Sequence, residues 1–323
     1  MNTLLRQRLP QLATAAIFLL LFTAASLRYD YFFSARNGAN LFISNASLGI
    51  IGVGMTLVIF SGGIDLSVGA VAGFTNILFA TLVARHGWHP LPATLVGLVL
   101  GALFGAAMGA VIHFFKQPAF LVTLAGMFFA RGGAFWIDEL SVTVKHPFFV
   151  MLTDVKAQLG DTTVHPLPAI IFFVVLAAGY LVAQFTRFGR NLLAVGGSEQ
   201  SALLMGLPVG ATKVTAYAIC GATAALGGLV NTLITGTGNC TFGVGLELDA
   251  IATVVIGGTL LTGGRGHMFG TLCGLLIIGT IQSAISFDGS LSASWARIIT
   301  GALLLGFILL QRLLLRATQK RLA

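Results

Sequence analysis

The chain has 323 residues, of which 56% are hydrophobic and only 9% are charged. Soluble domains carry about 25% charged residues, so this composition excludes an ordinary water-soluble protein. The net charge of +8 does not indicate nucleic acid, because the basic residues stand in short segments between apolar runs rather than among aromatic side chains.

Ten apolar stretches follow one another along the chain. A membrane-spanning helix needs about 20 apolar residues, and only helices or closed barrels satisfy their backbone in lipid. The first stretch, after Arg6 and Arg8, resembles a signal peptide, but it is long enough to span and others follow, so we expect an uncleaved helix. The eighth is short and is interrupted by Gly257 and Gly258. The stretches are residues 10–28, 42–60, 64–84, 91–115, 118–138, 166–186, 213–235, 248–263, 266–286 and 293–314.

These stretches predict an all-α polytopic membrane protein with about ten transmembrane helices in a single transmembrane domain, residues 1–323. Lys and Arg accumulate on the cytoplasmic side of membranes. With the N-terminus inside, eleven basic residues fall in cytoplasmic segments and five in outer ones, so both termini are expected in the cytoplasm. The eleven are Arg6, Arg8, Lys116, Arg187, Arg190, Lys213, Arg265, Arg312, Arg316, Lys320 and Arg321; the five are Arg28, Arg36, Arg85, Lys145 and Lys156.

Two glycine-rich junctions have the same spacing. SGG at residues 61–63 is followed by Gly69 and Gly73, and TGG at residues 262–264 by Gly270 and Gly274. Paired glycine breaks can mark a duplicated transporter fold, although chance similarity in glycine-rich sequence is the alternative. The helix count places both junctions on the cytoplasmic side, which does not fit an inverted repeat.

Asp65 stands at the start of the third stretch. A carboxylate at membrane depth is expensive and usually functional, which favours a role in an inner gate. The alternative is an N-cap of the third span that accepts backbone N–H groups. The two interpretations are compatible.

Residues 187–213 read as a cytoplasmic loop that contains a short amphipathic helix over residues 198–206. Ser198 or Gly197 can cap this helix, and Glu199 lies near its positive end. Its apolar side, formed by residues 203–205, needs a partner: a cytoplasmic protein, the membrane surface or its own bundle.

Residues 236–249 are too polar and glycine-rich to span, and they predict an outer loop or a re-entrant segment. Uncharged polar side chains occur near or within spans, where they suit a neutral hydroxylated solute or hydrogen bonds between helices. From polarity and position we predict a translocation path at Asn45, Asn76, Thr123, Met127, Phe128, Asn231 and Asn239. No P-loop, HExxH or GxSxG motif occurs, so the sequence predicts no enzyme. Cys220, Cys240 and Cys273 have no metal-binding spacing with the six histidines, so no metal site is expected.

Several segments resemble the ribose/xylose/galactose-type ABC sugar importer permeases. They are GGIDLSVG at 62–69, FGR at 188–190, AVGG at 194–197, ELDAIA at 247–252, VIGGT at 255–259 and GGRG at 263–266. The chain is most similar to a galactofuranose importer permease subunit, through LAGMFF at 124–129, RG at 131–132, HP at 146–147 and FDGSLS at 287–292. Ser198 stands where this family normally has Asn after its second glycine.

The resemblance implies a type II ABC importer-like permease in the bacterial inner membrane. It implies a periplasmic sugar-binding protein, a second related permease chain in a heterodimer, and a cytoplasmic ATPase with two nucleotide-binding domains. ATP-Mg would bind that ATPase, and no cofactor would bind this chain. The loop helix would couple ATP closure to transport through Gly197, Ser198, Glu199, Ala202, Leu203, Leu204, Met205 and Gly206; Ser61, Gly62, Gly63, Asp65, Ser67 and Gly69 would form the signature or gate.

Two other classes of function remain open from the sequence. A stand-alone secondary transporter or channel predicts uptake without an ATPase, but charges within the membrane are scarce. An intramembrane enzyme predicts clustered catalytic groups, and the sequence offers none.

Overall fold

The computed structural model describes residues 3–159 and 162–319, and most of this part is helical. Each of the ten predicted stretches contains a helix or part of one. Within the described residues, five helices are long and apolar enough to cross a membrane alone, or six if α2 and α3, which meet at 51°, are counted as one bent span. Ten spans therefore stay a prediction. The helices are α1 (Thr3–Arg28), α2 (Ala35–Ser44), α3 (Ala46–Phe60), α4 (Val68–Ala84), α5 (Pro90–Phe114), α6 (Ala119–Ile137), α8 (Leu167–Phe185), α11 (Val209–Thr235), α12 (Leu246–Ile256), α13 (Met268–Asp288) and α14 (Ala293–Gln319).

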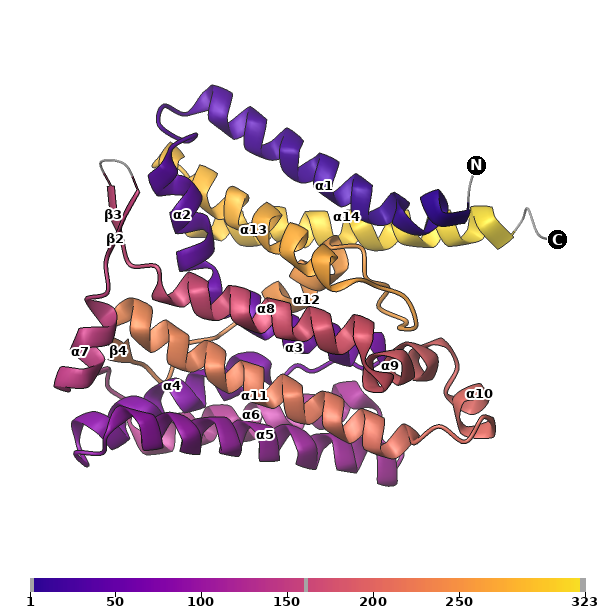
Figure 1. Ribbon diagram of the computed structural model, residues 1–323, viewed down its shortest axis with the longest axis horizontal. Coiled ribbons are helices and arrows are strands. Elements are labelled where there is room, and N and C mark those ends of the chain that lie inside the picture. Colours follow the sequence, from indigo (N-terminus) through magenta and orange to yellow (C-terminus); the bar gives the residue numbers. More distant parts are fainter. Residues whose placement is uncertain (1–2, 160–161, 320–323) are drawn as a thin grey trace.

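The connecting segments hold the shorter elements. At one end of the bundle are α7 (Pro147–Thr153) and the hairpin of β2 (Ala157–Leu159) with β3 (Thr162–Val164); at the other are α9 (Arg187–Gly197) and α10 (Glu199–Leu204) (Figure 1). Strand β1 (Val142–Thr143) pairs antiparallel with β4 (Thr237–Gly238). The first turns of α1 and the last turns of α14 lie at the end that carries α9 and α10 (Figure 1).

Three histidines begin helices. His89, His146 and His267 are the N-caps of α5, α7 and α13, and the Nδ1 atom of each accepts a backbone N–H two residues later, at 3.1–3.3 Å. Such a bond satisfies one of the donors that a helix start leaves unpaired. Capping therefore accounts for half of the six histidines without a ligand.

Helix α3 forms the centre of the bundle, and every one of its residues is buried. Glycines let its neighbours approach closely, as in membrane helices generally. Gly101 and Gly105 on α5 face the backbone of Tyr217 and Gly221 on α11, where any Cβ would collide. This contact fixes α5 and α11 side by side (Figure 1).

The eighth predicted span differs from the structure. Helix α12 has only 11 residues and ends at Ile256, after which residues 257–267 turn into α13. At 1.5 Å per residue it is about 16 Å long, too short to cross a bilayer. The crossing is therefore made in two parts, by the loop before α12 and by α12 itself. Hydropathy alone extends the helix to residue 263, but Gly257 and Gly258 end it.

Candidate functional site

Helix α10 confirms the short helix predicted in the 187–213 loop. Ser198 is its N-cap, with Oγ accepting the Ser201 N–H at 3.2 Å, and Gly206 follows it with a φ of 73°. Lys213 Nζ lies 2.7 Å from Glu199 Oε2 and ties the helix to α11. The loop is therefore a defined unit at one end of the bundle.

One side of α10 is buried and the other is not. Ala202 is fully buried against Val195 and Val209, whereas Leu203, Leu204 and Met205 are 54%, 90% and 66% exposed. Exposed apolar groups of this size mark a contact with another protein or with the membrane. The alternative in which this apolar side packs on the protein's own bundle does not hold for the described residues.

Three glycine segments meet beside α10. Gly196, near the end of α9, packs on the carbonyl of Phe60, and the Gly264 N–H donates to that carbonyl at 3.1 Å. Gly62 and Gly263 touch in the same place. The glycine junction, residues 61–63, 196–197 and 262–264, thus joins the α3–α4 and α12–α13 turns to the base of α10.

The junction clarifies the internal similarity in the sequence. The two SGG and TGG turns contact each other, so they lie at the same end of the bundle, as the helix count predicts. The glycines that follow have different partners. Gly69 and Gly73 pack against residues 242–247, whereas Gly270 and Gly274 pack against α12. Equal spacing therefore serves two different contacts and is no evidence of symmetry.

Asp65 is fully buried at the start of α4, yet it is not the helix cap. Ser67 holds the N-cap position, and Asp65 Oδ1 accepts its N–H at 2.9 Å and its hydroxyl at 2.7 Å. The expectation of an Asp65 cap is corrected because the helix begins three residues later. The thiol of Cys220 lies beside the carboxyl, and the Tyr217 hydroxyl donates to the Ile64 carbonyl at 3.2 Å.

The glycine-rich loop after β4 folds inward. Arg131 on α6 donates through Nη1 to the carbonyls of Phe242 at 2.6 Å and Cys240 at 3.2 Å. Asn76 Oδ1 accepts the Asn239 N–H at 2.6 Å. The loop, residues 239–245, is thus neither an outer loop nor a re-entrant segment, because it does not return to its own end. It leads from β4 into α12, and the turn after α12 lies in the glycine junction at the other end of the bundle. The signal in the sequence for its anchor is an arginine within an apolar span, yet Arg131 is missing from the predicted site residues.

Of the predicted path residues, Asn76 and Asn239 are bonded to each other, and the others make separate contacts. Asn76 and Thr123 are fully buried and bonded to nearby groups: Asn76 to Gly228 and Thr232, Thr123 to Ala119. Asn45, at the α2–α3 bend, donates to Leu41.

The other three helical residues differ in exposure. Phe128 is 67% exposed, and Met127 and Asn231 are partly buried. Asn239 belongs to the loop of residues 239–245 and donates to Ser141 at 3.0 Å. A role in translocation stays a prediction for all seven.

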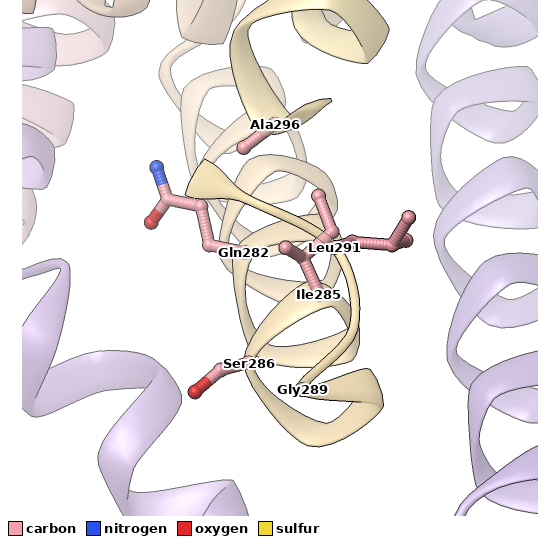
Figure 2. A pocket seen from close by; sticks show the side chains of 6 residues that line it. All are labelled: Gln282, Ile285, Ser286, Gly289, Leu291 and Ala296. Atoms are coloured by element: carbon pink, nitrogen blue, oxygen red, sulfur yellow. The ribbon is translucent and has the colours of Figure 1, made fainter. Parts of the chain in front are cut away.

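A hollow of about 290 Å³ lies where α13 ends and α14 begins. Gln282 and Ser286 project to one side of α13 there, while Ile285 and Leu291 form its apolar part (Figure 2). Being open, it does not enclose a solute. Among the described residues no group of three His, Cys, Asp or Glu side chains could hold a metal ion.

Long apolar helices, an embedded non-helical passage and an exposed loop helix define a polytopic membrane permease. The chain belongs to the family described as "Branched-chain amino acid transport system / permease component", which matches residues 37–308. It is 43% identical to the inner membrane ABC transporter permease protein YjfF of Escherichia coli K12, over 96% of this chain and 93% of that protein.

Other relatives carry the names of sugars. The fructose import permease protein FruG of Bifidobacterium longum is 37% identical, over 95% of this chain and 92% of its own. The ribose import permease protein RbsC of Escherichia coli K12 is 35% identical, over 84% of each chain. No solved structure matches the chain. The chain is therefore a non-catalytic permease component of the ABC sugar importer family, which confirms the wider resemblance.

Proposed function

We propose that this chain is the permease subunit of a binding-protein-dependent importer that moves a monosaccharide, galactofuranose or a similar furanose, into the cytoplasm. ATP hydrolysis on a separate ATPase with two nucleotide-binding domains drives the transport, and ATP-Mg binds there. A periplasmic binding protein delivers the sugar to a heterodimer of this chain and a second related permease in the bacterial inner membrane. Both termini of the chain lie in the cytoplasm.

The observation that carries this proposal is the exposed apolar side of α10. Leu203, Leu204 and Met205 project from a capped helix whose base is fixed to the glycine junction. A partner that moves α10 therefore acts on both helix breaks at once. The names of the relatives, which include ribose, fructose and xylose, support a sugar rather than the branched-chain amino acid of the family's description.

The test is isolation followed by transport. The tagged chain is purified from native membranes in mild detergent, its stoichiometric companions are identified by mass spectrometry, and the assembly is reconstituted in vesicles. We expect an ATPase and a second permease, and ATP-dependent uptake of labelled galactofuranose that excess ribose, xylose or leucine competes for weakly or not at all.

The contrary outcomes are distinct. Uptake that follows an ion gradient, without ATP or a partner, would show a stand-alone transporter. Preferential uptake of leucine would follow the family's description and overturn the sugar assignment. Recovery of this chain as the only permease would replace the heterodimer by a homodimer.

A further inference from the structure

The depth of the loop of residues 239–245 follows from its neighbours. Gly228 on α11 packs against the Ala72 carbonyl on α4. Gly228 precedes the end of α11 at Thr235 by seven residues, which is about 10 Å at 1.5 Å per residue. Phe242 packs on Gly73 at this level. Gly243 and Glu247 pack on Gly69, one helical turn or about 5 Å deeper.

The loop therefore reaches the middle of a hydrocarbon layer about 30 Å thick. Its backbone is extended or turned there, with left-handed φ values at Gly243 (80°) and Gly245 (86°). Non-helical backbone at this depth is tolerated only where protein covers it or water fills the space beside it. One side of the loop meets this condition through Arg131 and Asn76.

The other side is open. Val244 and Leu248 are 61% and 58% exposed, and Thr241 is exposed between them and the loop's start. Asp249, in the first turn of α12, is only partly buried at the same depth, whereas Glu247 turns its carboxylate inward, onto Gly69 and the Gly245 N–H. Ionisable groups at the bilayer centre are too costly to face lipid, so this side does not face the acyl chains.

The charges around this face balance. Arg131 acts on Glu247, and Arg297 on α14 acts on Asp249. Of these four groups, Arg131 and Glu247 are turned to the loop and the bundle, while Asp249 and Arg297 together carry no net charge that would attract an ion. They also offer both hydrogen-bond acceptors and donors, which suits hydroxyl groups.

We infer that residues 239–249 form the wall of a water-filled route for a neutral, hydroxyl-bearing solute, halfway through the membrane. This inference rests on the proposed function and names the surface of the chain that performs it. The route lies on the face of α12 that carries Leu248 and Asp249, beside the loop that Arg131 holds.

The test is cysteine labelling of the complete importer in membrane vesicles during ATP turnover. Thr241→Cys and Val244→Cys are each exposed to 2-(trimethylammonium)ethyl methanethiosulfonate, which reacts with thiols in water and does not enter lipid. Leu103→Cys on α5 is the matched control, because Leu103 is also 61% exposed, in a regular apolar helix. The unsubstituted chain gives the background, since Cys220, Cys240 and Cys273 are buried.

We expect both loop cysteines to react at least about tenfold faster than Leu103→Cys, and saturating sugar to slow them. The anionic 2-sulfonatoethyl reagent should react at the same rate relative to a free thiol in solution as the cationic one does. A tenfold preference for either charge would overturn the neutral solute. Loop cysteines as slow as the control would overturn the water-filled wall. Uptake is measured in the same vesicles. Slow loop cysteines together with normal uptake would contradict the water-filled wall and leave the proposed function unaffected.

Discussion

The charged residues buried in the bundle perform different tasks. Asp65 accepts the N–H and the hydroxyl of Ser67 just before α4, and Arg131 donates to two carbonyls of the loop of residues 239–245. Each side chain replaces water where the backbone leaves regular helix, which is how irregular backbone persists in a membrane. Their structural work is visible in the single chain, whereas a gating role for Asp65 can only be shown by transport.

Substitution of Asp65 separates these two roles. Asp65→Asn keeps an oxygen for the Ser67 N–H and hydroxyl and removes the ionisable group. Asp65→Ala leaves those donors buried without an acceptor, at about 1–3 kcal/mol each. We expect Asp65→Ala to lower the melting temperature in detergent and Asp65→Asn to change it little. A folded Asp65→Asn variant without uptake would establish the gating role; normal uptake by Asp65→Ala would show that neither role matters.

Removal of Arg131 should release the loop of residues 239–245. Arg131→Met deletes two charge-assisted hydrogen bonds, worth about 1.5–3 kcal/mol each, and leaves Glu247 without its opposite charge. We expect a clear loss of thermal stability, partly restored by Glu247→Gln in the same chain. Arg36→Met is the control, because Arg36 is an exposed arginine in α2. Equal effects of the two arginine substitutions would contradict the anchoring role.

At the scale of elements, α9 and α10 connect a surface to the core. The end of α9 lies in the glycine junction, and α10 follows after Ser198 with its apolar side open. Because the junction leaves no room for a methyl group at Gly196, movement of α10 has to be taken up by the turns on either side of it. In the proposed mechanism, Gly196 is therefore the mechanical link between α10 and the bundle.

Two neighbouring glycines provide the experiment. A Cβ at Gly196 would collide with the Phe60 carbonyl, whereas a Cβ at Gly197 meets nothing within 4 Å. Both residues lie in α9, where Ala is favoured over Gly by about 1 kcal/mol. We expect Gly196→Ala to reduce uptake at least tenfold while the ATPase stays bound, and Gly197→Ala to behave as the unsubstituted chain. Equal uptake by both variants would remove the junction from the coupling path.

The apolar side of α10 gives a second prediction at this scale. Met205→Glu places a charge on a side chain that is 66% exposed, so the fold should persist while ATPase binding weakens by at least tenfold. Gln200→Glu adds the same charge to an exposed polar residue of α10 and is the control. Co-purification of the ATPase measures the effect. If the Met205→Glu chain co-purifies as much ATPase as the unsubstituted chain does, the apolar side contacts the membrane surface instead.

The elements differ in how far the sequence predicts them. The long helices and the capped helix α10 follow from local patterns, namely apolar length, Ser198 and Gly206. The passage of residues 236–256 does not, because hydropathy counts apolar residues and is blind to backbone satisfied by distant groups such as Arg131. The contact of Gly196 with Phe60 is likewise long-range. Sequence spacing pointed to residues 61–63 and 262–264 but not to the third segment that joins them.

At the scale of the whole molecule, the two ends of the bundle are distinct. One end carries α7 and the β2–β3 hairpin; the other carries α9, α10, the glycine junction and the outer turns of α1 and α14 (Figure 1). Lys116, Arg187, Arg190, Lys213 and Arg265 belong to segments at the second end. By the distribution of Lys and Arg, this end is expected in the cytoplasm. Residues 1–2 and 320–323, which include both termini and Lys320 and Arg321, lie outside the described part.

Sidedness can be measured with one residue from each end. Gln158 lies in β2 and Gln200 in α10, and both are exposed. In intact spheroplasts, a membrane-impermeant maleimide should label Gln158→Cys and leave Gln200→Cys unreacted; after permeabilisation both should react. The reverse pattern would place α10 outside, away from any ATPase, and would exclude an ATP-driven importer. The glycine junction fixes α10 to one end of the bundle, so labelling of both cysteines in intact spheroplasts would show that the two ends do not lie on opposite sides of the membrane.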